Sequence, residues 1–199
     1  MKQKINLITS ITIFIISSLL ISGCTTKKTT DTNMDLNIIP TSSQATITTS
    51  KSKTNTNPVV SLKTKYGEIL LKLYQDKAPN TVSNFLKKAD SGFYNGLTFH
   101  RVEEDFVVQG GDPLGNGTGG GDIKSEINNV PFVKGTIGLA RGGNINISND
   151  SQFFICLTTE MCQGLTSLYV NFGEVISGLD ILDKIKIGDK IVEITSKTK

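Results

Sequence analysis

The sequence predicts a mainly β domain over residues 58–199, a closed antiparallel barrel of eight short strands capped by two helices. Short runs of β-branched and aromatic residues recur between turn residues, and several of them alternate apolar with polar side chains. Only two segments carry apolar residues at helical spacing. Closing the strands into a barrel would remove exposed edges. Periodicity alone does not separate this barrel from other all-β folds.

The first two predicted strands form a hairpin that turns at Tyr66-Gly67. They span Val59–Lys65 and Glu68–Tyr74, and every second residue from Ile69 to Leu73 is apolar, which predicts one buried face. Six further strands are predicted at residues 97–102, 106–109, 136–140, 152–157, 170–175 and 190–195.

The first predicted helix begins near Pro79, which suits a first helical turn, and ends near Gly92. Its apolar residues at helical spacing are Val82, Phe85, Leu86 and Ala89. A second, shorter helix is predicted from Leu179 to Lys186, because Leu179, Leu182 and Ile185 have the same spacing.

The amino-terminal residues 1–23 are typical of a secretory signal: Lys2 and Lys4 precede an apolar run that ends in Ser-Gly-Cys. The run Leu20–Cys24 resembles a bacterial lipobox, in which Cys24 receives a lipid. We therefore expect a protein of the cell envelope, lipid-anchored on the extracytoplasmic side of a membrane. An uncleaved signal anchor is the alternative, because the apolar run is nearly long enough to span a bilayer.

Residues 24–57 are dominated by Thr, Ser, Asn and Lys. Such a segment buries too little apolar surface to offset the entropy lost on ordering. We expect a disordered tether between the lipidated Cys24 and the folded domain.

Composition and charge exclude several classes of function. The net charge of the 199 residues is +3, and no basic run is interleaved with aromatic residues, so nucleic acid is not an expected partner. No spacing typical of metal ligands occurs, and neither a metal nor another cofactor is expected. The folded part is the size of one domain, and we expect a monomer.

Two cysteines remain in the domain, Cys156 and Cys162. An exported protein could pair them, but Cys156 lies within an apolar strand pattern and a disulfide needs suitable geometry. The sequence favours a buried free thiol at Cys156, with the disulfide as the alternative.

Three motifs carry the clearest functional signal. They are Phe99-His100-Arg101, Gln109-Gly110-Gly111-Asp112 and Ser151-Gln152-Phe153-Phe154-Ile155, with the glycine-rich run 115–121 between the second and third. In this order they closely resemble the cyclophilin family of peptidyl-prolyl isomerases, and the resemblance runs from Val59 to Ile194. It implies a cyclophilin-like barrel whose partners are proline-containing peptides and unfolded exported proteins.

Prolyl isomerisation needs rotation about an amide bond over a barrier of about 18–20 kcal/mol. No bond is made or broken, so neither a nucleophile nor an acid–base pair is needed. A cation or donor aimed at the proline nitrogen favours the twisted amide, where the lone pair is localised. The resemblance implies that Arg101 has this role. From strand context alone, Arg101 would be a surface residue paired with Glu103, Glu104 or Asp105.

The resemblance also implies a substrate site around Arg101. Four residues match the wall of a proline pocket: Phe106, Val107, Phe154 and Leu165. Gln109 and Gln152 match polar residues that hold the substrate backbone and steady the arginine. The remaining matches are Gly117 in the glycine-rich wall, Ala140 and Arg141 on a strand that pairs with the peptide, and Tyr169. Without the resemblance, the apolar members would be plain core, and Phe153 is expected to point into the barrel.

The chain departs from the family pattern in two segments. Many relatives carry a tryptophan near Glu160–Leu165 that also contacts cyclosporin, whereas this chain has none. We therefore expect weak cyclosporin binding. The segment Gly142–Asp150 also differs from the proline-containing turn of bacterial relatives.

Other functions remain as alternatives. One is a non-catalytic proline-peptide binding module, a tethered holdase or adaptor. A hydrolase would have to use His100, the only histidine. A phosphate loop would need a Gly-Lys-Ser/Thr ending that the glycine-rich run lacks. A solute-binding lipoprotein would need an interior cavity, against which the bulky apolar strand residues argue.

Overall fold

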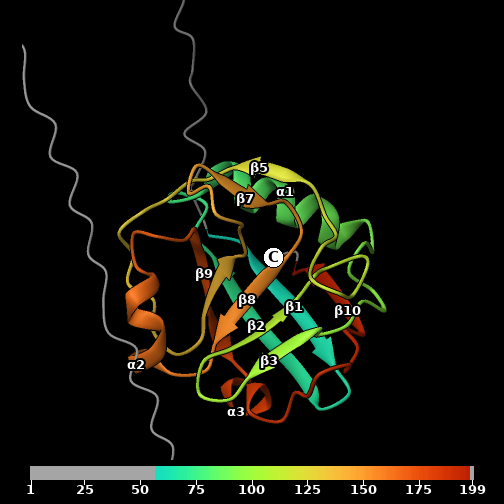
Figure 1. The fold of residues 1–199 in the computed structure, drawn as a ribbon. Helices are drawn as coiled ribbons and strands as arrows, with labels where there is room; N and C mark the ends of the chain where they lie inside the picture. Colours follow the sequence, from blue (N-terminus) through green and yellow to red (C-terminus); the bar gives the residue numbers. More distant parts are fainter. Residues whose placement is uncertain (1–56, 198–199) are drawn as a thin grey trace, which may run out of the picture. The chain divides into compact units, whose positions relative to one another are not determined.

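One antiparallel sheet of eight strands contains most of the β-structure in residues 57–197, the part of the chain that the computed structural model describes (Figure 1). The strands follow the spatial order β10-β1-β2-β9-β6-β8-β4-β3. The prediction of a mainly β domain with eight principal strands is confirmed. In chain order they are β1 (Val59–Thr64), β2 (Gly67–Leu73), β3 (Arg101–Glu103), β4 (Val107–Gly110), β6 (Thr136–Leu139), β8 (Phe153–Cys156), β9 (Asn171–Ser177) and β10 (Glu193–Ser196).

The sheet curls into a barrel whose two end strands, β3 and β10, are not paired with each other. The segments that precede them complete the ring instead. Phe99 N–H donates to the Asp189 carbonyl and Ile191 N–H to the Leu97 carbonyl, each at 2.8 Å. This explains why the strand predicted at 97–102 is shorter than expected: residues 97–100 bond across the closure.

Within residues 57–197, three α-helices accompany the sheet, one more than predicted. α1 (Pro79–Asp90) covers one end of the barrel and α3 (Leu179–Leu182) lies at the opposite end (Figure 1). The helix predicted to reach Lys186 ends at Leu182. Turns follow it and bury Ile185 without continuing the helix, although the spacing of Ile185 is helical. The additional helix is α2 (Thr159–Cys162), and the 3-10 helix η1 (Gln163–Leu165) follows it directly.

A second, two-stranded sheet was also not predicted. It pairs β5 (Asp122–Lys124) with β7 (Ile147–Asn149) near α1 (Figure 1). Each strand has only three residues, too few for an alternating pattern to be recognised. The pairing joins the end of the glycine-rich run to the loop that follows β6.

The buried apolar residues of the described part of the chain form two clusters separated by the wall of the barrel. The larger one fills the interior and includes Phe85, Phe99, Phe153 and Phe172, all at most 1% exposed. The smaller one contains Phe154 and Cys156 on the other face of β8. Since neighbouring residues of a strand point to opposite faces, Phe153 enters the barrel and Phe154 does not, as predicted.

Within residues 57–197, no helix is long and apolar enough to cross a membrane. The same residues contain no group of three or more His, Cys, Asp or Glu side chains arranged to hold a metal ion. The predicted signal, the lipidation of Cys24 and nearly all of the tether lie outside the described residues.

Candidate active site

A cleft of about 160 Å³ lies on the outer face of the barrel beside the smaller apolar cluster. Nine of the eleven residues expected to bind or act on substrate line it. They are Arg101, Phe106, Val107, Gln109, Ala140, Arg141, Phe154, Leu165 and Tyr169. The other two, Gln152 and Gly117, lie behind Gln109 in a hydrogen-bonded chain.

The register of three strands brings the polar and apolar parts of the cleft together. Arg101 on β3 is directly opposite Gln109 on β4, and Gln109 is opposite Phe154 on β8. Directly opposite residues of an antiparallel pair share a face. Arg101, Gln109 and Phe154 therefore form one row across the barrel wall.

A chain of hydrogen bonds holds Arg101 in the cleft. Its Nη1 donates to Gln109 Oε1 at 3.0 Å, and Gln109 Nε2 donates to Gln152 Oε1, also at 3.0 Å. Gln152 is 3% exposed and donates to the carbonyls of Gly119, at 2.8 Å, and Gly117, at 3.2 Å. Because each amide oxygen accepts and each amide nitrogen donates, the chain fixes the orientation of both glutamines.

Glu103 binds the other two nitrogens of the Arg101 guanidinium. Nε and Nη2 donate to Glu103 Oε1 at 3.1 and 2.7 Å. An ion pair with Glu103 and a place in the pocket are alternatives on the sequence alone, and the structure combines them. Nη1 and Nη2 each keep a second N–H for a substrate.

Aromatic side chains build the apolar wall. Phe154 stacks on Phe132, with ring centroids 5.7 Å apart and planes at 20°. It also makes a T-shaped contact with Tyr169, with ring centroids 5.6 Å apart and planes at 89°. Gly138 makes room for this stack, because an added Cβ would lie 2.6 Å from Phe154 Cζ and 2.7 Å from Phe132 Cε1. Arg101 also lies over the Phe106 ring, with Cζ 5.7 Å from its centroid.

Asp112 organises the glycine-rich run, a role that is not among the sequence predictions. Its carboxylate is 1% exposed and accepts the backbone N–H groups of Leu114, Asn116 and Gly117. Burial raises the pKa of Asp112, but these three hydrogen bonds outweigh it and leave the pKa below its usual value. The signal for this role was a short acidic residue before Pro113 and several glycines, a pattern typical of side-chain-capped turns.

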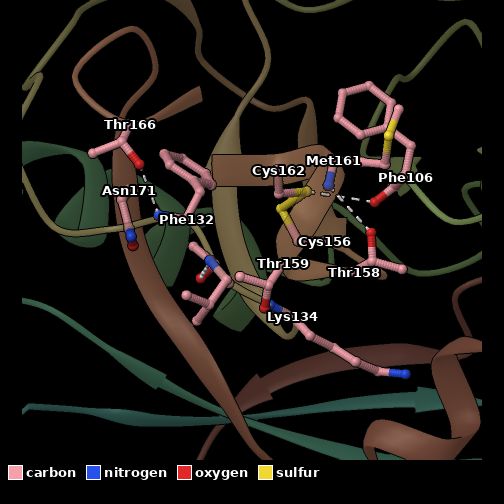
Figure 2. The surroundings of a disulfide bond; sticks show 12 residues. Phe106, Phe132, Lys134, Cys156, Thr158, Thr159, Met161, Cys162, Thr166 and Asn171 are labelled. Atoms are coloured by element: carbon pink, nitrogen blue, oxygen red, sulfur yellow. Dashed lines mark hydrogen bonds between the residues drawn. A yellow bond between two sulfur atoms is a disulfide. The ribbon is translucent and has the colours of Figure 1, made fainter. Parts of the chain in front are cut away.

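A disulfide joins Cys156 on β8 to Cys162 on α2 (Figure 2). The expectation of a free thiol at Cys156 is therefore wrong. The reason is the short helix α2, which turns the chain back toward β8. Thr158 caps its beginning, because the Thr158 hydroxyl accepts the Met161 N–H. Six positions separate the cysteines, yet their Cα atoms are only 6.2 Å apart.

Further contacts hold the segment that carries Leu165 (Figure 2). Thr158 donates its hydroxyl to the Asp105 carbonyl, and Cys162 Sγ lies 3.5 Å from the Phe106 carbonyl. On the far side, the hydroxyls of Thr159 and Thr166 accept backbone N–H groups from Lys134 and Phe132. The cleft wall is therefore tied to two neighbouring loops as well as to β8.

His100 takes no part in a hydrolase-like arrangement. Both ring nitrogens are buried and have no hydrogen-bond partner within residues 57–197. A serine hydrolase needs its histidine bonded to both a nucleophile and an orienting carboxylate. The adjacent residue Arg101, not His100, reaches the cleft.

The barrel, with an arginine beside an apolar cleft on its outer face, has the fold of a cyclophilin. A solved structure of a cyclophilin-type peptidyl-prolyl cis-trans isomerase from Cryptosporidium parvum, determined in the presence of the dipeptide Ala-Pro, aligns with a TM-score of 0.65 and 29% identity. The alignment covers 71% of this chain and 99% of that one. A second structure of the same protein gives a TM-score of 0.66.

The sequence comparisons agree with the fold. The family model for cyclophilin type peptidyl-prolyl cis-trans isomerase/CLD matches residues 59–198. A peptidyl-prolyl cis-trans isomerase of Synechococcus elongatus is 41% identical over 137 residues, which are 67% of this chain and 92% of the relative. One of Helicobacter pylori is 44% identical over 139 residues, 67% of this chain and 83% of the relative.

The chain therefore belongs to the cyclophilin-type peptidyl-prolyl cis-trans isomerase family. Its activity is that of the family, acceleration of the cis-trans rotation of X-Pro peptide bonds.

Proposed function

We propose that this isomerase acts on exported proteins outside the cytoplasm, as a monomer held at the cell envelope through a lipid on Cys24, and that Arg101 is its catalytic residue. The observation that carries the assignment of Arg101 is its position. Its guanidinium is held by Gln109 and Glu103 at the rim of an apolar cleft.

The cleft provides what the reaction needs. Phe106, Phe154 and Leu165 offer an apolar surface for a proline ring. The remaining N–H groups of Arg101 are donors for the amide nitrogen, whose lone pair localises as the bond twists. Such a contact is stronger in the twisted state than in the planar one, so it lowers the barrier. The Ala-Pro dipeptide in the Cryptosporidium parvum work supports proline peptides as ligands.

Two observations support a place outside the cytoplasm. The first is the sequence of residues 1–23 with Cys24, which is typical of a secretory signal followed by a lipidated cysteine. The disulfide between Cys156 and Cys162 is independent of them, and structural disulfides are rare in reducing cytosol and common in exported proteins. Metabolic labelling with a radioactive fatty acid, followed by the same labelling of Cys24→Ser, tests the anchor: the wild type is expected to carry label and the variant none.

The catalytic assignment is tested on residues 58–199 with a protease-coupled prolyl-peptide assay. Arg101→Ala is expected to lower kcat/KM by about a hundredfold, because about 2.7 kcal/mol of transition-state stabilisation is a factor of that size. Arg101→Lys keeps the charge but not the planar donor set, and should recover only part of the rate. Circular dichroism checks that both variants are folded.

Unchanged turnover in Arg101→Ala would show that the rate acceleration does not depend on this guanidinium. Peptide binding without any rate acceleration by the wild type would instead indicate a tethered holdase or adaptor. The two outcomes are separated by measuring peptide affinity by calorimetry on the same preparations.

A further inference from the structure

Two guanidinium groups line the cleft, and their charges are balanced differently. Arg101 Nη2 lies 2.7 Å from the Glu103 carboxylate. Arg141 donates instead to two main-chain carbonyls, from Nε to Leu168 at 2.9 Å and from Nη1 to Gly142 at 2.8 Å. Within residues 57–197, no carboxylate forms an ion pair with Arg141. Its positive charge therefore reaches the cleft without a neutralising partner.

Arg141 is also held in place before any peptide binds. Its Cζ lies 4.5 Å from the centre of the Tyr169 ring, and Tyr169 packs edge-on against Phe154 in the apolar wall. The bond to the Leu168 carbonyl joins the loop after β6 to the segment before β9. A guanidinium that is already ordered loses less entropy when it binds a ligand.

The hydrogen bonds of Arg141 leave one terminal nitrogen available. In the described part of the chain, Nε and Nη1 have the carbonyl partners given above, and Nη2 has none. A guanidinium nitrogen with free N–H groups is a good donor to a carboxylate, since charge-assisted hydrogen bonds are stronger than neutral ones. Arg101 differs, because the Glu103 carboxylate already lies against its Nη2 and would repel a second carboxylate there.

We propose that Arg141 gives the isomerase a preference for prolyl bonds next to an acidic residue, whose carboxylate accepts a hydrogen bond from Nη2. This inference rests on the isomerase function and names a class of substrate for it. An acidic residue at the Arg101 side would instead approach Glu103, with Glu104 and Asp105 following in the sequence. The preference is therefore expected at one side of the proline only.

The test compares four prolyl peptides that carry Glu or Gln immediately before or immediately after the proline. At low salt, we expect the kcat/KM of the wild type to be about fivefold higher for Glu than for Gln at one of the two positions. The ratio should approach one at about 1 M salt, where the Debye length is only about 3 Å. In Arg141→Gln, the ratio of kcat/KM for Glu over Gln peptides should be about one at both positions, whatever the effect on overall turnover.

Lys87→Gln is the matched control, because it removes one positive charge from the exposed face of α1, outside the cleft. It should leave the ratio as in the wild type. Turnover of the Gln peptides with no preference for Glu at either position would overturn the inference and leave the isomerase function intact. A preference that survives in Arg141→Gln would assign it to another group. If no peptide were turned over, the function itself, and the inference with it, would fail.

Discussion

Arg101 and Glu103 extend from the same face of β3, and the Glu103 carboxylate accepts hydrogen bonds from two nitrogens of the Arg101 guanidinium. Both side chains are about half exposed, at 40% and 51%, so the ion pair adds little to the free energy of unfolding. The ion pair instead fixes the position of the Arg101 guanidinium. Together with Gln109, it leaves the guanidinium one orientation in the cleft.

Removal of this carboxylate should therefore change activity more than stability. Glu103→Ala is expected to lower kcat/KM about threefold to tenfold, because Arg101 then has a single fixed partner. Glu103→Gln keeps an acceptor and should retain most of the activity. Glu104→Ala, the neighbouring exposed carboxylate, serves as the control in the peptide assay. Equal rates for Glu103→Ala and wild type would show that Gln109 alone positions the arginine.

The two glutamines behind Arg101 should behave as one unit. Gln109→Ala removes the contact to Nη1, and Gln152→Ala removes the group that orients Gln109. Each variant is expected to lower kcat/KM about tenfold. The double variant should have about the same kcat/KM as the less active single variant, since the effects of substitutions within one network do not add. A double-mutant cycle on kcat/KM measures the coupling, and effects that multiply would contradict it.

Much of this row of residues could be predicted from the sequence. The alternation of Gln152, Phe153 and Phe154 correctly separates a core residue from two residues on the outer face of the barrel. Nine of the eleven residues that the family resemblance selects line the cleft. What the motifs could not show is that Glu103 binds Arg101 within the site, because a pair two residues apart on a strand is equally typical of an ordinary surface.

The remaining errors have local physical causes. Leu179, Leu182 and Ile185 have helical spacing, yet turns after Leu182 bury Ile185 without continuing the helix. The disulfide depends on α2, a four-residue helix whose apolar pattern is too short to recognise. The pairing of β5 with β7 brings together segments about 25 residues apart, which periodicity does not report.

The disulfide should matter for both stability and substrate binding. Closing so short a loop contributes about 2 kcal/mol through the entropy of the unfolded chain. The variant that combines Cys156→Ala with Cys162→Ala should lose about that much in urea unfolding, and its KM should rise because α2 and η1 carry Leu165 into the cleft. A dithiol reductant should shift the wild type in the same direction and leave the variant unchanged. A wild type whose KM is indifferent to reductant, with loss of the disulfide verified by mass, would limit the bond to a role in stability.

The Asp112 carboxylate predicts a dependence of stability on pH. Its pKa is lower in the folded state than its usual value of about 3.9, so it stabilises the fold above about pH 4 and this contribution is lost as the pH falls further. Asp112→Asn should cost about 2 kcal/mol in urea unfolding at pH 7, and this cost should shrink progressively as the pH is lowered below about 4. The exposed Asp122→Asn is the control. A cost that does not shrink with acid would assign the effect to packing rather than to charge.

Cyclosporin should inhibit this isomerase weakly, because the segment before Leu165 offers no indole ring or indole N–H donor. Half-inhibition is expected to need at least about tenfold more cyclosporin than for a tryptophan-containing relative in the same assay. Gly164 is the informative position: it directly precedes Leu165, and an added Cβ there meets no atom within 4 Å. Gly164→Trp should strengthen inhibition, whereas Met161→Trp, on α2 and outside the cleft lining, should not. Equal inhibition of the wild type and the relative would mean that the tryptophan contributes little to cyclosporin binding in this setting.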